Sequence, residues 1–198
     1  MLHPENVPQE LQEIPQWICW KRYKGAKTPC SMRDNGKFYA CNWKDPEYWL
    51  TFEDAVKTYL EDHRGEAELE GIGLVMTREL GLVGIDLDGV TNPDNAGVDS
   101  YAELSPSGNG VRIFAWGTDI EVSRHPEGVG IFTHDRWLSV TGNSIGSISW
   151  VADCTTEIRM LMNRVLEGDI NHDKLNRLMQ VRGFERFWTF EAFKDKDL

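Results

Sequence analysis

The sequence is short of positive charge. Its 198 residues include 21 lysines and arginines against 32 aspartates and glutamates, which gives a formal net charge of −11. Phosphate contacts supply most of the non-specific affinity of proteins for nucleic acids, so this balance argues against a generally basic DNA-binding surface. Local basic clusters therefore matter more than the total. The clearest one contains Lys21, Arg22, Lys24 and Lys27, and it fits either a solvated turn after a strand or a contact with nucleic acid or a triphosphate.

Long apolar runs and closely paired cysteines are also missing. No stretch approaches membrane-spanning length, and the segment 1–5 lacks the basic start and apolar run of a signal peptide. The four cysteines lie far apart, and none forms a C-x-x-C pair typical of a zinc ribbon or a redox motif. These absences predict a soluble, intracellular protein with reduced and mostly buried thiols, and no membrane partner.

Hydrophobic patterns and turn residues divide the chain into short elements. They predict turns at 24–25 and 34–36, a short helix or turn at 8–13, helices at 52–63 and 155–168, and strands at 17–20, 37–41, 71–76, 80–87, 111–116 and 137–141. We expect residues 1–150 to form one domain and residues 151–198 a helical segment that packs on it. An aromatic stripe at 184–193 fits packing on the main domain or a contact with another protein.

The segment 83–89 carries the most informative motif, Asp-Leu-Asp-Gly at the end of an apolar run. Side chains alternate along a strand, so Asp86 and Asp88 project from one face and Leu87 from the other. Two carboxylates at this spacing can share hard divalent cations, and their burial is costly without such compensation. Turns and carbohydrate-transfer enzymes also carry a D-x-D motif, so the pair alone does not decide between these possibilities.

A second candidate element is the glycine- and serine-containing loop at 103–112. Its backbone N–H groups can approach a triphosphate closely, and the arginine that follows adds a fixed positive charge. The loop lacks the G-K-[ST] sequence of a P-loop, and an ordinary hairpin turn explains it equally well. The candidate nucleotide-binding residues in and after it are Ser105, Ser107, Gly108, Gly110 and Arg112.

A third element places Arg136 at the start of the strand expected at 137–141. This arginine can bind phosphate, or it can pair with a neighbouring acid such as Asp135. Its spacing does not distinguish the two roles.

The order of these blocks is more specific than any one of them. Along residues 6–143 the blocks are Ile-Pro-Gln-Trp-Ile-Cys-Trp at 14–20, Lys-Thr-Pro at 27–29, and further blocks at 45–55, 71–75, 84–88, 100–110 and 136–143. In this order the sequence resembles the primase-polymerase domain of the archaeo-eukaryotic primase superfamily, in the branch found in phages, plasmids and prophages.

The resemblance implies a two-lobed α+β fold with a catalytic sheet like that of an RNA-recognition motif. It also implies template-directed nucleotide transfer with two Mg²⁺ or Mn²⁺ ions. At the matching positions Asp86 and Asp88 would be the catalytic, metal-binding residues, the loop up to Gly110 would cradle the incoming triphosphate, and Lys27 and Arg136 would be its charged partners. The expected partners are a single-stranded DNA template, nucleoside triphosphates and a replication protein such as a helicase, in the cytoplasm of a bacterial or archaeal host.

Two departures from the family pattern concern catalysis. Arg112 stands where many relatives have a histidine, and Gly130 stands at the position of the family's third carboxylate. Losing one metal-binding acid should weaken the binding of at least one cation. Glu121, Glu127 and Asp135 are near enough in the sequence to be considered as substitutes.

Three functions are therefore weighed. The first is a replication enzyme of a mobile element, either stand-alone or part of a longer protein. The second is a catalytically degenerate primase-fold protein that binds nucleotide, nucleic acid or a protein partner. The third is an unrelated sugar-nucleotide transferase with a D-x-D metal site, although such enzymes usually need a larger nucleotide-binding domain.

Overall fold

The protein has an α+β architecture built from two antiparallel sheets. A computed structural model describes residues 1–65, 67–89, 97–124 and 128–166. In this part of the chain the sheets are accompanied by three α-helices, α1 (Gln9–Gln12), α2 (Phe52–Asp62) and α3 (Thr155–Leu166), and by 3-10 turns at Pro4–Asn6, Pro46–Tyr48 and Arg78–Leu80. None of these helices is long and apolar enough to cross a membrane.

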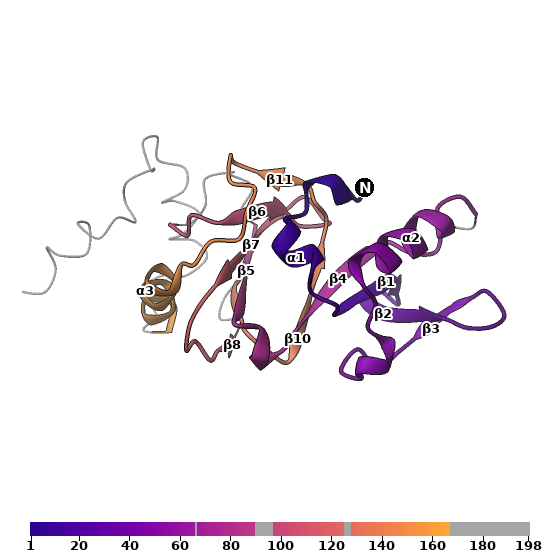
Figure 1. Cartoon of the computed structure of the whole chain (residues 1–198), viewed down its shortest axis with the longest axis horizontal. Coiled ribbons are helices and arrows are strands. Elements are labelled where there is room, and N and C mark those ends of the chain that lie inside the picture. The colour runs from indigo at the N-terminus through magenta and orange to yellow at the C-terminus, as the bar shows by residue number, and fades with distance from the viewer. Residues whose placement is uncertain (66, 90–96, 125–127, 167–198) are drawn as a thin grey trace, which may run out of the picture.

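The first sheet has five strands in the order β10-β4-β1-β2-β3, and α2 packs against β1 and β4 (Figure 1). Its strands are β1 (Trp17–Tyr23), β2 (Ala26–Met32), β3 (Phe38–Ala40), β4 (Gly71–Met76) and β10 (Arg136–Val140). The second sheet has six strands in the order β11-β6-β7-β5-β9-β8. They are β5 (Leu82–Asp88), β6 (Tyr101–Leu104), β7 (Gly110–Trp116), β8 (Ser123–Arg124), β9 (Val129–Phe132) and β11 (Ser144–Ile145).

Local chemistry explains the elements that the sequence predicts. Thr51 caps α2, because its hydroxyl accepts a hydrogen bond from the backbone N–H of Asp54 at 3.1 Å. The β1–β2 hairpin turns at Lys24 and Gly25, whose φ angles are 50° and 83°, as a tight two-residue hairpin requires. The cysteines are buried at positions 19, 30 and 154 and partly buried at 41, so the prediction of mostly buried thiols is confirmed.

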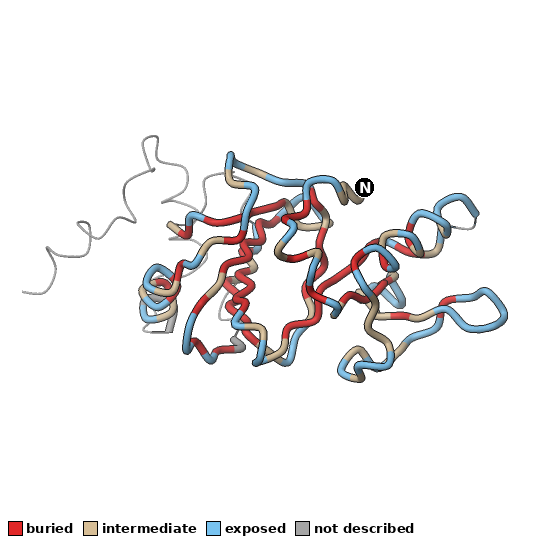
Figure 2. Tube along the Cα trace, viewed as in Figure 1, coloured by how far each residue is buried: buried red, intermediate tan, exposed pale blue. Residues whose placement is uncertain are grey.

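Strand β5 separates two hydrophobic cores. The side chain of Leu82 joins the core between the two sheets, whereas Val83, Ile85 and Leu87 face the other way, toward a core that includes Ile158 of α3. Figure 2 shows the central strands as the most buried part of the trace. The alternation expected for the segment 83–89 is therefore present, and it leaves Asp86 and Asp88 on the face directed toward the first sheet.

The two sheets approach each other closely at Gly84. A methyl group at this position would overlap Cδ1 of Leu138 on β10, so glycine lets this leucine pack directly on the backbone of β5. This contact fixes the position of β10 relative to β5, and both strands contribute to the cavity described below.

Several boundaries and strands differ from the sequence predictions. The strand expected at 80–87 begins at Leu82, because Arg78–Leu80 forms a 3-10 turn that ends at Gly81 with φ of 65°. Strands β2, β6 and β9 were not predicted, since they are short or contain glycine and proline. Helix α3 places Ile158 and Leu161 against the second sheet, whereas the aromatic stripe at 184–193 lies outside the described residues.

The Gly84 contact predicts a measurable loss of stability. We expect Gly84→Ala to lower the free energy of unfolding by about 1–3 kcal/mol, because the added methyl group must displace Leu138 in a packed core. Urea denaturation of the variant and the wild type measures this difference. Gly65→Ala is the matched control, since its Cβ would meet nothing nearer than the Asp62 carbonyl oxygen at 3.6 Å. Equal stability of the two variants would contradict the prediction.

Candidate nucleotide-binding site

A row of charged residues crosses the second sheet on its inner face. The strand register places Gly130 of β9 opposite Asp86 of β5, Asp86 opposite Arg112 of β7, and Arg112 opposite Glu103 of β6. Directly paired residues in neighbouring strands point to the same face. Across the sheet the row is therefore a glycine, an acid, a base and an acid. It lies at the edge of the apolar layer between the sheets.

Arg112 is the centre of this row. Its side chain is 5% exposed, and its Nε donates to Oδ1 of Asp86 at 3.1 Å. A terminal guanidinium nitrogen of the same residue donates to the carbonyl oxygen and the hydroxyl of Ser139 on β10, at 2.6 and 2.5 Å. Arg112 thus joins the second sheet to the first. A nearly buried guanidinium is stable here because both a carboxylate and neutral acceptors surround it.

Glu103 lies behind Arg112 and is completely buried. Its carboxylate accepts hydrogen bonds from the backbone N–H groups of Thr141 and Gly142 and from the hydroxyl of Tyr101, at 2.9–3.1 Å. Burial raises the pKa of Glu103, while Arg112 and these donors act in the opposite direction. The residue anchors the turn after β10 to β6, which makes it part of the support of the site.

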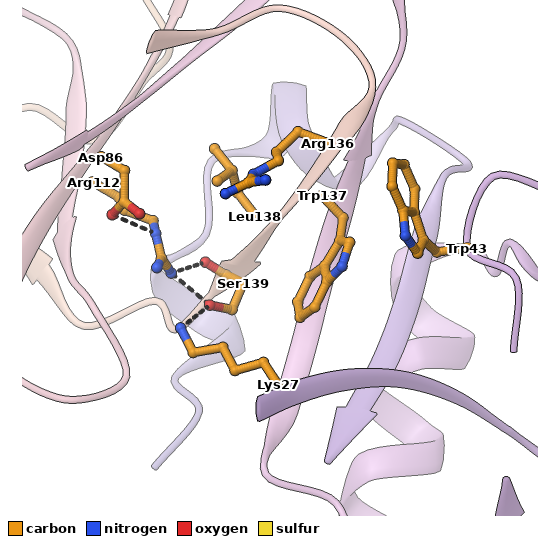
Figure 3. Close-up of a pocket in the computed structure, with 8 residues that line it drawn as sticks. All are labelled: Lys27, Trp43, Asp86, Arg112, Arg136, Trp137, Leu138 and Ser139. Carbon is orange, nitrogen blue, oxygen red and sulfur yellow. Dashed lines mark hydrogen bonds and ion pairs between the residues drawn. The ribbon is translucent and has the colours of Figure 1, made fainter. Parts of the chain in front are cut away.

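A cavity of about 330 Å³ opens in front of the charged row (Figure 3). Its volume is within the range of small-molecule binding sites. Three cationic side chains, one carboxylate, one hydroxyl, one leucine and two indoles line it: Lys27, Arg112, Arg136, Asp86, Ser139, Leu138, Trp43 and Trp137. Such a combination of convergent cations suits an anionic ligand.

Lys27 reaches this cavity from β2. Its ammonium group donates to the hydroxyl of Ser139 at 3.2 Å and lies 5.4 Å from the ring centre of Trp20. Burial, followed by the charge of Arg112, lowers the pKa of Lys27 to about 8, whereas Asp86 acts in the opposite direction. Part of the lysine population is therefore neutral just above neutral pH, and a bound anion would favour the charged form.

The glycine-containing loop lies next to Asp88, at the end of the same strands. Gly110 is the register partner of Asp88, and the N–H of Gly89 donates to the carbonyl oxygen of Asn109 at 2.6 Å. A side chain at position 110 would come within 2.9 Å of the Leu87 carbonyl oxygen, so glycine permits this close approach. The loop joins β6 to β7 as a hairpin, in agreement with the simpler of the two interpretations.

The structure brings some of the predicted site residues together and leaves others apart. Lys27, Asp86, Arg112 and Arg136 line the cavity, whereas the loop residues Ser105, Ser107, Gly108 and Gly110 lie outside its lining, beside Asp88. The hydroxyls of Ser105 and Ser107 are 3.1 Å apart. The predicted acids and the predicted loop thus meet at one end of β5, with Asp86 directed into the cavity and Asp88 at its exposed end.

Some residues of the basic cluster near the β1–β2 turn line the cavity and others do not. Lys21 pairs with Glu68 and Arg22 pairs with Glu70, so these two cations are neutralised outside the cavity. Lys27 is the member of the cluster that lines the cavity.

Arg136 does not pair with its neighbour in the sequence. Asp135 binds Lys44 at 2.9 Å, while the guanidinium of Arg136 lies 4.8 Å from the ring centre of Phe132 and lines the cavity. Of the two roles considered for this arginine, the ion pair with Asp135 is therefore wrong.

The strand register locates Gly130, the position where the resemblance predicts a third carboxylate. Gly130 is directly opposite Asp86, so an acid at this position would have pointed to the same face of the sheet. Glu121 binds Arg78 at 2.8 Å, Asp135 binds Lys44, and Glu127 lies outside the described residues. Among the described residues, no group of three or more histidines, cysteines or acids is placed to hold a metal ion.

Asp86 and Asp88 can be compared with the ligands that a divalent cation prefers. Mg²⁺ is often held by one or two carboxylates that substrate phosphates and water complete. Asp86 and Asp88 match that donor set for one hard cation, although Arg112 already binds one oxygen of Asp86. A second cation lacks its own carboxylate, since glycine occupies the position opposite Asp86.

Sequence reasoning missed four residues of the site, namely Trp43, Trp137, Ser139 and Glu103. The signal for two of them was present. Trp137 and Ser139 lie two residues apart in the strand that begins at Arg136, so they share one face of it, and both line the cavity. Trp43 and Glu103 come from distant segments, and nothing in the local sequence indicates that they approach the site.

The chain is similar to a known replication protein. It is 25% identical over 149 residues to the DNA primase-polymerase of Nitratiruptor phage NrS-1, a match that covers 67% of this chain. The matched region makes up 20% of that relative, so the chain spans about a fifth of the relative's length. No family model matches the chain. The similarity supports a distant relationship to primase-polymerases.

The environment of Lys27 generates a prediction about its titration. We expect its apparent pKa to be about 8, below the ordinary value for a lysine. Carbon NMR of the ¹³C-dimethylated protein across pH 6–11 measures this value, and Lys27→Arg assigns the signal. Arg112→Met should raise the pKa, because a nearby cation is removed, and Asp86→Asn should lower it further. A Lys27 signal that titrates near the unperturbed value of about 10.4 would contradict the described burial.

Proposed function

We propose that this chain is the nucleotide-binding and nucleotidyl-transfer domain of a primase-polymerase-type replication protein from a phage, plasmid or prophage. The convergence of Lys27, Arg112 and Arg136 on one cavity beside Asp86 carries this proposal. The similarity to a phage primase-polymerase is further support, since the match covers 67% of the chain and not the cavity residues alone.

The cavity provides the chemistry that a triphosphate requires. Arginine guanidinium groups bind phosphate oxygens through paired N–H donors, and a lysine adds a mobile point charge. Arg112 is held rigidly by Asp86 and Ser139, whereas the exposed Arg136 lies at the outer end of β10. In this proposal Arg112 and Lys27 hold the inner phosphate oxygens, and Arg136 approaches the ligand from the outer side.

The carboxylates give the site its proposed reaction. Asp86 and Asp88 would hold Mg²⁺ or Mn²⁺, and such a cation neutralises charge that develops on the phosphate oxygens during transfer. The loop from Ser105 to Gly110 lies beside Asp88, where its backbone can contact a ligand that extends from the cavity. A single-stranded DNA template, nucleoside triphosphates and a helicase-type replication protein are the proposed partners, in the cytoplasm of a bacterial or archaeal host.

A second function is favoured by a specific observation. Gly130 removes the third carboxylate, and the nearly buried ion pair between Arg112 and Asp86 neutralises one of the two remaining acids. A domain with these features can bind nucleotide without transferring it. This alternative predicts nucleotide affinity without a polymerised product, and it describes a degenerate primase-fold accessory protein.

A primer-synthesis and primer-extension assay tests the first function against the second. We expect the wild type to form labelled product from nucleoside triphosphates on single-stranded templates with Mn²⁺ or Mg²⁺. Asp86→Asn/Asp88→Asn should reduce the rate at least about 100-fold, since the cation loses its protein ligands. Asp34→Asn/Asp119→Asn is the control, because it removes two exposed carboxylates elsewhere. Nucleotide binding by a wild type that forms no product at high concentration would favour the accessory role.

Restoring an acid opposite Asp86 should strengthen the cation site. We expect Gly130→Asp to bind Mn²⁺ more tightly than the wild type, and to raise any transfer activity, because a third carboxylate then faces the same point. Isothermal titration calorimetry with Mn²⁺ measures the first effect, and the extension assay measures the second. Gly130→Asn supplies a side chain of the same shape without the charge. If the Asp and Asn variants bind Mn²⁺ equally, the carboxylate at this position does not reach the cation.

A further inference from the structure

The cavity has an aromatic side that the proposed phosphate contacts do not use. Trp137 and Trp43 line it together with the three cations. In Figure 3 the indoles of Trp137 and Trp43 appear on one side of the view and Asp86 and Arg112 on the other, with the ammonium end of Lys27 at Ser139. The site is therefore divided into a charged half and an aromatic half.

Trp137 lies flat against the backbone of the first sheet. A Cβ atom added at Gly73 of β4 would come within 2.7 Å of Cε3 of this indole, so the ring covers the glycine directly. Its ring centre is 6.2 Å from that of Trp20, which is buried. One side of the Trp137 ring is therefore fixed by packing, and the half-buried residue still contributes to the cavity wall. A rigid indole of this kind is a suitable stacking surface.

Trp43 is held by contacts of its own. The indole N–H of Trp49 donates to the carbonyl oxygen of Trp43 at 2.7 Å, and the ammonium group of Lys44 lies 5.3 Å from the Trp43 ring centre. Trp43 is also half-buried, and it comes from the segment between β3 and α2. Two distant parts of the chain thus place indoles at the same cavity. The packing of a single strand or helix does not explain this arrangement.

We propose that Trp137 and Trp43 bind the base of a nucleoside triphosphate by stacking, while Lys27, Arg112 and Arg136 bind its phosphates. This inference rests on the proposed function and adds the part of the ligand that the aromatic half recognises. Flat aromatic bases stack on indoles, and the interaction depends little on base identity because every base has a π-face. A template-directed enzyme needs this tolerance, since the template and not the protein selects the base.

Calorimetric titration with two probes separates the halves of the site. Inorganic tripolyphosphate offers the phosphates alone, and dATP offers phosphates and a base. In the presence of Mg²⁺ we expect the wild type to bind dATP about 10-fold more tightly than tripolyphosphate, as expected from stacking of one base. Trp137→Leu and Trp43→Leu should each weaken dATP binding several-fold and leave tripolyphosphate binding unchanged.

Aromatic replacements and a distant tryptophan provide the controls. Trp137→Phe and Trp43→Phe should recover most of the dATP affinity, because they keep a stacking ring while the leucines keep only apolar bulk. Trp150→Ala changes a tryptophan that is 53% exposed and outside the cavity lining, and it should bind both probes like the wild type. If Trp137→Leu unfolds the first sheet, Trp43→Leu decides the test.

The outcomes distinguish the two proposals. Equal affinity of the wild type for dATP and tripolyphosphate, or full dATP affinity in Trp43→Leu, would overturn base stacking and leave the anion site intact. Failure of the wild type to bind either probe would remove both the anion site and the inference that depends on it. If Lys27→Met/Arg136→Met binds neither dATP nor tripolyphosphate while the wild type binds dATP more tightly, the result supports the divided site.

Discussion

The buried guanidinium of Arg112 is the interaction on which the rest of the site depends. Its bonds to Asp86 in the second sheet and to Ser139 in the first connect the two layers beside the apolar core that lies between them. Removing a charge from water is costly unless its partners are close and well oriented. The strand register supplies such partners, because Asp86 and Glu103 flank Arg112 in one row. The position of the cavity follows from this row, since the cavity opens where charged residues replace the apolar layer.

The same ion pair changes what the acids can do without a ligand. In a site made of three carboxylates, mutual repulsion is relieved by a cation. Here glycine stands opposite Asp86 and Arg112 pairs with Asp86, so the charge of this carboxylate is balanced within the row. A cation that binds Asp86 must share this carboxylate with Arg112. The phosphates of a nucleotide would assist that exchange, because they offer the guanidinium alternative acceptors while also completing the coordination of the cation.

Sequence patterns predict the local part of this arrangement. The alternation in segment 83–89 places both aspartates on one face, and the turn predicted at 24–25 and the helix predicted at 52–63 are confirmed in the structure. The non-local part depends on strand order. Ser139 of the first sheet binds both Lys27 and Arg112 because of how the sheets pack. The alternation within one strand carries no information about this contact. Short strands such as β6 and β9 also lack a distinctive pattern, so the register that brings Gly130 opposite Asp86 could not be predicted.

Two glycines show why fold and site cannot be separated in this protein. Gly84 lets Leu138 approach β5, and Gly73 lets Trp137 lie against β4, so both set the position of β10 from opposite sides. Ser139 directly follows Trp137 and Leu138 in the sequence, and its carbonyl and hydroxyl oxygens accept hydrogen bonds from Arg112 at 2.6 and 2.5 Å. Hydrogen bonds of that length tolerate little displacement of the strand. The close packing of β10 therefore holds the guanidinium toward Asp86 and, through the same strand, holds the indole of Trp137 at the other side of the cavity.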